Sequence, residues 1–234
     1  MRVFVTGYGI VSAFGKSWAE FRSALLKKQN AVKYMKDWEQ YKELTTYLGA
    51  PILDYHYPKD WSRKQLRSLG RVSQYSVEAA GLALQMAGLY KDERIQDGRM
   101  GVASGSSTGS TDAVMQLAKL LSMGESDCNA NSYIKSMPHT TAANIAIFYG
   151  LKGRMIPTSS ACTSASHAIG YSYEAIKYGQ IPMMLAGGAE ELCPSECYVF
   201  NSLYATSQKN STPNLTPSPF DANRDGLVIG EGAC

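Results

Sequence analysis

Hydrophobic residues are arranged along the chain in two patterns, short β-branched runs and longer stretches with helical spacing. Residues 2–15 form an apolar run closed by glycines, which predicts a strand followed by a turn. Apolar residues then recur at helical spacing from Trp18 to Leu26, which predicts a helix. The chain is therefore expected to begin with a strand-to-helix step.

Strands and helices continue to alternate after an irregular segment. Residues 33–60 are aromatic and charged, and they predict only a short strand near residues 47–53. Helical spacing predicts helices at residues 62–89, 111–124, 141–153 and 163–179, with Gly70 as a natural break in the first. Short apolar runs predict strands at residues 99–105, 155–162, 181–190 and 227–234. This alternation indicates a layered α/β domain with a parallel sheet.

The last strand pattern is still open where the sequence reaches Cys234. It follows a polar, proline-containing loop at residues 207–226. Because a fold rarely stops at the start of an apolar strand, we expect this sequence to be a piece of a longer protein.

Composition is typical of a globular protein. The 234 residues are 44% hydrophobic and 18% charged, and no apolar run approaches the roughly 18 residues needed to span a bilayer. The N-terminal run is short and passes directly into a strand pattern, so we expect no secretory signal and a cytoplasmic location. A net charge of +3 is too small to indicate nucleic-acid binding.

The five cysteines favour reduced thiols over disulfides or a metal site. They are Cys128, Cys162, Cys193, Cys197 and Cys234, an odd number without the spacing of a disulfide scaffold. The close pair in CPSEC lacks the second Cys or His pair that a zinc site needs. We therefore expect no metal there.

Two glycine-containing motifs match nucleotide-binding patterns only in part. Gly7 and Gly9 fit the start of a dinucleotide fingerprint, but Ser12 takes the place of the third glycine and no suitable acidic residue follows. We interpret these glycines as tight-turn residues. The GSSTGS loop, Gly105–Ser110, lacks the Lys-Ser/Thr ending of a phosphate-binding loop and is better explained as a turn that permits close packing.

Cys162 is the strongest candidate for a chemically active residue. A lone cysteine beside an apolar strand is usually an inert packing residue. Here small residues surround it in SSACTSAS, and a strand-to-helix turn would place its thiol at a helix N-terminus, which favours the thiolate. A hydrolase elbow requires glycines where serines stand here. His167 is rotated by about 140° on the following helix, whereas His56 and His139 stay open as partners on spacing alone.

Four segments of the chain form a recognisable set, which consists of VTGYGIVSAFG, SSACTSASHAIG, MLAGGAE and PFDANRDGLVIGEGA. In order and spacing they resemble the N-terminal half of the β-ketoacyl synthases, closest to the elongating type that acts on carrier-protein thioesters. The resemblance implies a thiolase-like fold of two similar α-β-α halves, each with a mixed, mostly parallel sheet. Residues 1–234 would supply the N-terminal domain, with the C-terminal half absent from this sequence. No cofactor is expected.

The resemblance also implies a reaction. Cys162 corresponds to the cysteine that accepts an acyl group from acyl carrier protein, before decarboxylation of malonyl-carrier protein gives the carbanion that attacks the thioester. Its backbone amide would form part of the oxyanion hole. Two histidines, a lysine and a phenylalanine loop lie in the family's C-terminal half, so we expect the present chain alone to be inactive in condensation.

Further positions correspond to substrate-binding and partner-binding sites of the family. Phe200 corresponds to an aromatic residue near the acyl-cysteine pocket, with simple core packing as the alternative. Thr108 occupies a pocket-floor position that is often larger and apolar in relatives, which implies a roomier acyl pocket. Docking of acyl carrier protein is expected on the basic residues Arg63, Lys64, Arg67 and Arg71, for which a solvated helix face is the alternative.

The acidic residues of the resembling segments are interpreted as structural. Glu190, Asp221 and Asp225 are expected in turns and an ion pair, together with Arg224. His139 stands where many relatives have Asn. Family members pair as homodimers or as heterodimers with a related chain, and the alternative function is a non-catalytic subunit like the chain-length factors. Those factors lack the nucleophilic cysteine, so Cys162 favours an enzyme.

Overall fold

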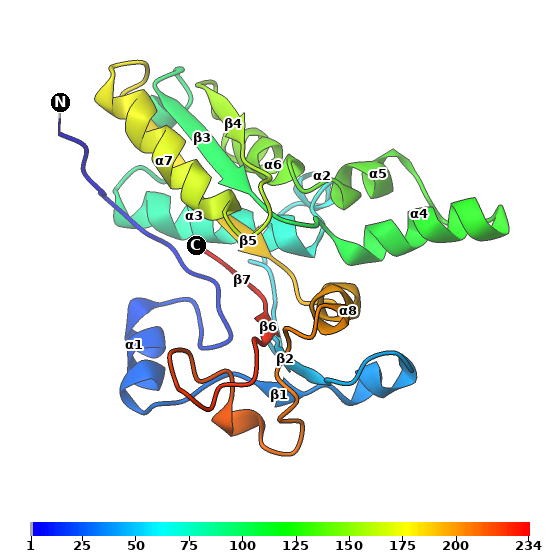
Figure 1. The fold of residues 1–234 in the computed structure, drawn as a ribbon. Coiled ribbons are helices and arrows are strands. Elements are labelled where there is room, and N and C mark those ends of the chain that lie inside the picture. The colour runs from blue at the N-terminus through cyan, green and yellow to red at the C-terminus, as the bar shows by residue number, and fades with distance from the viewer. Residues whose placement is uncertain (1) are drawn as a thin grey trace. The chain divides into compact units, whose positions relative to one another are not determined.

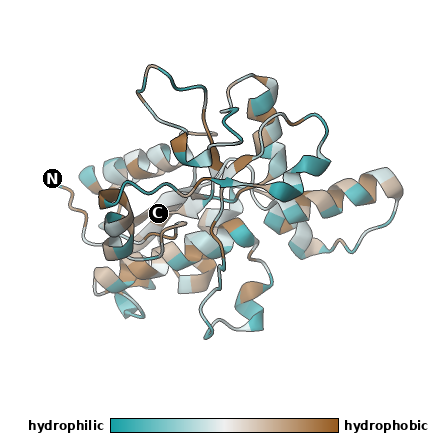
Figure 2. Cartoon of the chain, turned by 90° about the horizontal axis from the view of Figure 1, so that it is seen from below, coloured by the Kyte–Doolittle hydropathy of each residue, from teal (hydrophilic) through white to brown (hydrophobic). Residues whose placement is uncertain are grey.

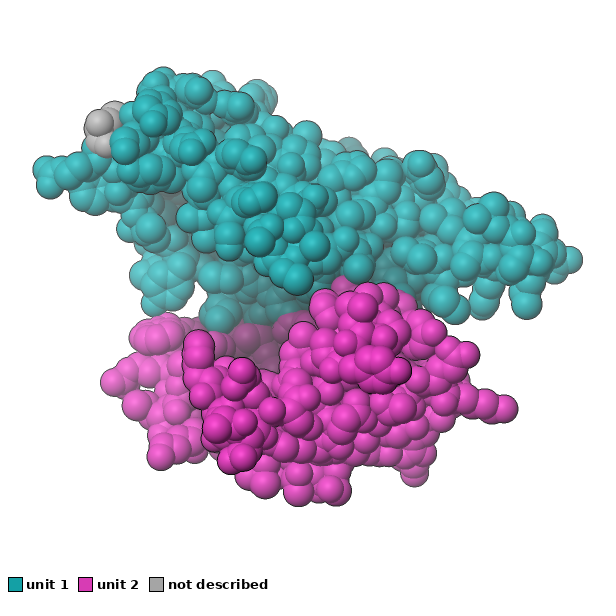
Figure 3. Space-filling model, viewed as in Figure 1, with its two compact units in different colours: residues 1–11, 56–191, 232–234 teal, residues 12–55, 192–231 magenta. Residues whose placement is uncertain are grey.

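The computed structural model describes residues 2–234, which form two compact units (Figure 3). Unit 1 contains the residues up to Val11, His56–Glu191 and Gly232–Cys234. Unit 2 contains Ser12–Tyr55 and Leu192–Glu231. Each unit therefore combines segments that are far apart in the sequence.

The sheet of unit 1 is mixed and mostly parallel. It contains β3 (Met100–Gly105), β4 (Met155–Pro157), β5 (Met183–Glu190) and β7 (Gly232–Ala233), in the spatial order β4-β3-β5-β7. β3 pairs in parallel with both β4 and β5, while β7 is antiparallel to β5. All six residues of β3 are buried, as expected for a parallel strand covered on both faces.

Helices cover both faces of this sheet (Figure 1). On one face, Met100 and Val102 pack with buried residues of α3 (Arg71–Met86) and α6 (Thr140–Tyr149). On the other face, α7 (Ser164–Lys177) approaches closely, because a Cβ on Gly188 would lie only 2.8 Å from the Cβ of Ala165. The expected layered α-β-α arrangement with a mixed, mostly parallel sheet is confirmed.

The remaining helices of unit 1 follow the predicted pattern with two differences. The helix predicted over residues 62–89 is divided into α2 (Arg63–Leu66) and α3, with Gly70 as the N-cap of α3. α4 (Thr111–Met123) matches the helix predicted over residues 111–124, and Gly124 ends it in the left-handed conformation. α5 (Ala130–Ser136) was not predicted, although Asn129 caps its first turn. A short 3-10 turn, η2, spans Glu93–Ile95.

Unit 2 contains a small three-stranded sheet and a separate core. Its strands are β1 (Lys33–Tyr34), β2 (Leu48–Ala50) and β6 (Ile229–Gly230), in the order β1-β2-β6. Trp38, Leu44 and Cys197 are buried together in its core. Its helices are α1 (Trp18–Leu26) and α8 (Pro194–Ser202), with 3-10 turns η1 (Lys36–Gln40) and η3 (Pro213–Leu215). Figure 2 shows hydrophobic and hydrophilic positions interspersed along the helices of the chain.

The strand predicted at the N-terminus is the main error. Residues 2–10 carry no strand, and the ladder begins only where Val11 exchanges two backbone hydrogen bonds of 2.9 Å with Ala233. Among the described residues, residues 3–9 line a cavity of about 380 Å³. Residues of β5 and Cys234 form other parts of its wall. A strand needs the backbone of a neighbour for its hydrogen bonds, which this segment lacks over its first residues.

Gly7 and Gly9 were also misinterpreted as turn residues. Neither has a positive φ, and a Cβ on Gly9 would lie 2.0 Å from the carbonyl oxygen of Ala79 in α3. These glycines therefore permit an extended backbone to lie against α3. The strand predicted over residues 155–162 is likewise shorter, because its partner β3 ends at Gly105 and the last ladder bond joins Thr158 N to Ser104 O.

No helix among residues 2–234 has both the length and the apolar character required to cross a bilayer.

Substitution of Gly188 tests the close approach of α7 to the sheet. In Gly188→Ala the new methyl group meets Ala165, so we expect the free energy of unfolding to fall by about 1–3 kcal/mol. Gly170→Ala is the matched control, because Gly170 lies in α7 where an added Cβ would enter open space, and there alanine should stabilise by about 0.5–1 kcal/mol. Urea unfolding measures both, and equal stability of the two variants would contradict the packing argument.

Candidate active site

Cys162 lies in the turn between β4 and α7. β4 ends at Pro157 and α7 begins at Ser164, with Thr163 as its N-cap. The Cys162 side chain is exposed. Ala161, immediately before it, has a φ of +52°, a conformation that costs a residue other than glycine on the order of 1–3 kcal/mol. The backbone thus turns sharply at the residue that precedes the thiol.

Hydroxyl groups hold this turn together. The Thr163 hydroxyl donates to the Ser160 carbonyl at 2.8 Å, and the Ser164 hydroxyl donates to the Ala161 carbonyl at 2.7 Å. The Ser160 amide in turn donates to the Ser164 hydroxyl at 3.0 Å. Small polar side chains therefore fix the strained backbone and leave the sulfur of Cys162 uncovered.

His167 is engaged with a different residue of the same turn. Its Nδ1 lies 3.0 Å from the hydroxyl oxygen of Ser160, and its ring centroid lies 5.8 Å from that of Tyr171. This pairing agrees with the expectation that helical rotation turns His167 away from the sulfur. His139 is exposed as the N-cap residue of α6 and forms no side-chain cap.

The other cysteines differ from Cys162 in their surroundings. All five are free thiols, with Cys193 and Cys197 buried and Cys234 exposed. Burial raises the pKa of Cys197 to about 11, with a further contribution from Cys193, so its thiol is protonated at neutral pH. No group of three His, Cys, Asp or Glu side chains within residues 2–234 is arranged to hold a metal ion.

The loop that carries Thr108 lies at the same edge of the sheet as Cys162. It follows β3, whose Ser104 is paired with Pro157 at the end of the parallel strand β4. Because the carboxyl ends of parallel strands meet at one edge, the loops after β3 and β4 are brought together there. Thr108 is exposed. The next residue, Gly109, has a φ of +71°, and a Cβ there would lie 2.6 Å from the Ser136 carbonyl oxygen, so only glycine fits this position.

Two consecutive carboxylates end β5 at this edge. Glu190 accepts hydrogen bonds from the Ser106 hydroxyl and the Ser107 amide, both at 2.6 Å. Glu191 accepts from the amides of Thr111 at 2.6 Å and Val72 at 3.3 Å, at the starts of α4 and α3. Burial raises the pKa of Glu191, against the lowering effect of the Thr111 bonds. Glu190 was predicted to be structural, whereas Glu191 was not predicted at all, because no local pattern identifies partners 80 or more residues away.

The predicted docking residues are all exposed. Arg63 and Lys64 lie on α2, and Arg67 is its C-cap. Within residues 2–234 these three side chains form no ion pair with an acidic residue. Arg71 begins the next helix, α3, with its guanidinium 5.5 Å from the ring centroid of Tyr75 and hydrogen-bonded to the Tyr75 hydroxyl. Docking by these four residues stays a prediction.

Phe200 belongs to unit 2. It lies half-buried on α8, which begins after Cys193. The carbonyl of Phe200 accepts a hydrogen bond from Ala205 at 3.0 Å, and the neighbouring Asn201 is anchored to Thr45 at 2.8 Å. Its role beside the acyl-cysteine pocket stays a prediction.

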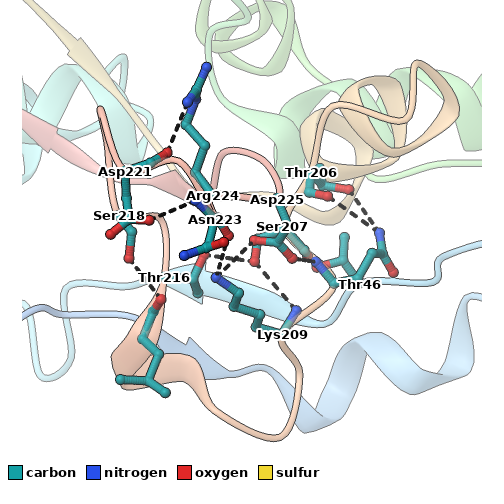
Figure 4. A network of polar contacts seen from close by, with 12 residues as sticks. Thr46, Thr206, Ser207, Lys209, Thr216, Ser218, Asp221, Asn223, Arg224 and Asp225 are labelled. Carbon is teal, nitrogen blue, oxygen red and sulfur yellow. Dashed lines mark hydrogen bonds and ion pairs between the residues drawn. The ribbon is translucent and has the colours of Figure 1, made fainter.

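Residues of the polar loop of unit 2, residues 207–226, form a network of hydrogen bonds (Figure 4). Asp221 accepts from the Asn223 amide at 2.7 Å, and Asp225 accepts from the Gln208 amide at 2.8 Å. Lys209 forms an ion pair with Asp225 at 3.6 Å. Burial alone would raise the pKa of Asp225, but the Gln208 bond and Lys209 lower it below its usual range. The structural interpretation of Asp221 and Asp225 agrees with these contacts.

Arg224 also has a structural partner in this loop, because it donates to the Asp221 carbonyl at 2.9 Å.

Comparison with known proteins identifies a single family. A family model described as Beta-ketoacyl synthase, N-terminal domain, matches residues 1–234. The chain is 32% identical over 234 residues to 3-oxoacyl-(acyl-carrier-protein) synthase 2 of Vibrio harveyi, covering 99% of this chain and 56% of that protein. It is 30% identical over 240 residues to a putative polyketide beta-ketoacyl synthase 1 of Streptomyces halstedii, with the same coverage. The chain thus spans about half the length of the curated relatives it matches.

Solved structures share the fold. A β-ketoacyl synthase from Burkholderia phymatum STM815 matches with a TM-score of 0.97 at 54% identity, over 99% of this chain and 57% of that one. A type II polyketide ketosynthase solved with its acyl carrier protein, AntDE:AntF, matches with a TM-score of 0.82 at 25% identity, over 99% of this chain and 56% of that one. These similarities confirm the predicted thiolase-like fold class.

Alkylation tests the exposure of the candidate nucleophile. With limiting iodoacetamide and peptide mass mapping, we expect Cys162 to be labelled at least as fast as the exposed Cys234, because small neighbouring side chains leave its sulfur uncovered. Cys193 and Cys197 serve as internal controls and should stay unlabelled while the protein is folded. Faster labelling of Cys234, or early labelling of the buried pair, would contradict this description.

Proposed function

The chain belongs to the β-ketoacyl synthase family, and from this we propose that the Cys162 thiol accepts an acyl group from acyl carrier protein for carbon–carbon bond formation. The single observation that carries the proposal is the exposed thiol on a strained turn between β4 and α7. It occupies the position in the chain that the family's acyl-accepting cysteine occupies. A thiol presented in this way is open to a thioester on a partner.

The proposed chemistry has two stages. The Cys162 sulfur attacks the carbonyl carbon of the carrier-bound thioester, forming a new C–S bond and releasing the carrier thiol, which takes up the proton. Decarboxylation of malonyl-carrier protein then yields a carbanion, which attacks the acyl-Cys162 carbonyl and expels the sulfur. The covalent intermediate divides a difficult condensation into two steps. The Cys162 backbone amide would stabilise the oxyanion.

Residues 1–234 are proposed to form the N-terminal half of a larger synthase. The matched relatives are nearly twice as long as this chain, which covers 56% of the Vibrio harveyi protein. The remaining catalytic groups of the family are expected in the half that this sequence does not include. The chain by itself should therefore accept an acyl group without completing condensation, and the expected cytoplasmic location stays a prediction.

We also propose partner chains, from the similarity of this chain to solved ketosynthase structures. One structural neighbour is a ketosynthase in complex with its acyl carrier protein, and others contain a ketosynthase with a chain length factor. We expect this protein to bind an acyl carrier protein and to pair with a second copy or a related chain. The alternative of a non-catalytic chain-length-factor-like subunit is disfavoured by the presence and exposure of Cys162.

Acylation at Cys162 is the direct test of this function. Incubation with acyl-loaded carrier protein should add one acyl group to the protein, located at Cys162 by peptide mass spectrometry. Cys162→Ala should abolish the addition, whereas Cys234→Ser, which removes the other exposed thiol, should keep it. Acylation that persists in Cys162→Ala would overturn the proposal. Condensation by the isolated 234-residue chain would overturn its assignment as an incomplete half.

Charge reversal tests carrier-protein docking on α2. In the double variant Lys64→Glu and Arg67→Glu, repulsion of an acidic partner should lower kcat/KM with acyl carrier protein about tenfold at low ionic strength. The rate with a small acyl thioester should stay within about twofold, because small thioesters need no protein docking. Lys152→Glu, an exposed charge elsewhere in unit 1, is the control. Equal loss for both substrates would exclude docking at this site.

A further inference from the structure

Extending the acyl-accepting role proposed above for Cys162, we infer that Glu190 is a positioning residue that sets which acyl groups the site accepts. It does so by fixing the loop of Ser106, Ser107 and Thr108, here called the 106–108 loop. The carboxylate does not react in this scheme. It holds the backbone on which Thr108, the predicted pocket-floor residue, is carried.

Glu190 contacts every residue of the 106–108 loop. Its Oε1 accepts the Ser106 hydroxyl at 2.6 Å and the Thr108 hydroxyl at 3.2 Å, and lies 3.4 Å from the Thr108 amide. Its Oε2 accepts the Ser107 amide at 2.6 Å. Hydrogen bonds to an ionised carboxylate are shorter and roughly twice as strong as neutral ones. All three residues of the 106–108 loop are therefore hydrogen-bonded to the Glu190 side chain.

The strand register explains why Glu190 reaches this loop. Gly105 at the end of β3 is paired with Gly188, so β5 continues for two residues beyond its neighbour. Side chains alternate between sheet faces, which places Glu190 on the same face as Gly188. That is the face covered by α7, since a Cβ on Gly188 would meet Ala165. Glu190 thus stands at the sheet edge and on the sheet face from which the turn carrying Cys162 enters α7.

Both ends of the loop also have contacts other than Glu190, although the Ser106 hydroxyl is shared between Glu190 and Gly109. At its start, a Cβ on Gly105 would lie 2.1 Å from the Thr158 carbonyl oxygen, so β3 is pressed against the chain that leads to Cys162. At its end, the Gly109 amide donates to the Ser106 hydroxyl at 3.2 Å, and Gly109 packs against the Ser136 carbonyl. Ser107 and Thr108 between these points are exposed. Loss of the carboxylate should therefore loosen the middle of the loop without unfolding its ends.

Glu191, the residue directly after β5, provides a matched comparison. Its carboxylate binds the amides of Val72 and Thr111 at the starts of two helices, and it is more deeply buried than Glu190. No hydrogen bond between Glu191 and residues 106–108 occurs in the described part of the chain. Substitution of Glu191 should change helix anchoring and stability, whereas substitution of Glu190 should change acyl selectivity.

The experiment compares acylation of Cys162 by two small thioesters, the acetyl and octanoyl esters of N-acetylcysteamine, in the full-length protein. The ratio of octanoyl to acetyl rates is measured for the unaltered protein, Glu190→Ala, Glu190→Gln and Glu191→Gln. A loosened loop lets the pocket floor retreat, so the ratio should rise about fivefold in Glu190→Ala. Glu190→Gln keeps one acceptor oxygen and should give an intermediate rise. In Glu191→Gln the ratio should stay within about twofold, because the 106–108 loop is retained.

Two further readouts separate positioning from general damage. Iodoacetamide labelling of Cys162 should keep its rate in the Glu190 variants, and amide hydrogen exchange should increase at Ser107 and Thr108 in particular. An unchanged ratio in folded Glu190→Ala would overturn the role of Glu190. If that variant does not fold, an unchanged ratio in Glu190→Gln overturns it equally. Absence of any Cys162 acylation in the unaltered protein would instead overturn the proposed function, while exchange at the loop still reports on the Glu190 contacts.

Discussion

Parallel pairing of β3 with β4 on one side and β5 on the other is the constraint on which the candidate site depends. It brings the segments that follow three strands to one edge of the sheet, although they are widely separated in the sequence. Glu190 is the last residue of β5, whereas Thr108 and Cys162 lie in the segments that follow β3 and β4. A register shift of one residue would move Glu190 by about 3.3 Å and turn it to the other face.

Close packing of small residues allows the helix after Cys162 to begin where it does. Gly188 and Ala165 meet at the interface of β5 and α7, and larger side chains there would push the helix away. The turn before the helix also stores strain at Ala161, whose positive φ costs on the order of 1–3 kcal/mol. The hydroxyls of Thr163 and Ser164 offset part of that cost. An exposed thiol on a strained turn is thus maintained by the close packing of small residues between β5 and α7.

The two carboxylates at the end of β5 show how neighbours in sequence acquire different tasks. Glu190 is half-buried and gathers a surface loop, whereas Glu191 is buried and anchors two helix starts. Glu190 is the last residue of β5, whereas Glu191 lies directly after the strand and its carboxylate reaches different elements. The helix start anchored through Val72 also follows directly on the basic segment at Arg63, Lys64 and Arg67. The end of β5 and the residue after it therefore contact both the 106–108 loop and the start of α3, which follows the segment proposed to dock the carrier protein.

Much of the fold, and the exposure of the candidate nucleophile, could be predicted from the sequence. Hydrophobic patterning located β3, β5, α4, α6 and α7, and the small residues around Cys162 correctly indicated an uncovered thiol. Local patterns failed where a neighbour from elsewhere in the chain decides the outcome. Residues 2–10 have strand composition but no ladder, and α5 and α8 were not predicted.

By itself, the sequence determined the layered α/β class, the family and the residue that presents a thiol before a helix, because all of these rest on local spacing. Only the tertiary structure decided the partners of Glu190 and Glu191 and the placement of Phe200 in unit 2. Those contacts join residues far apart in the chain, and strand register and helix packing, which no single segment encodes, bring them together.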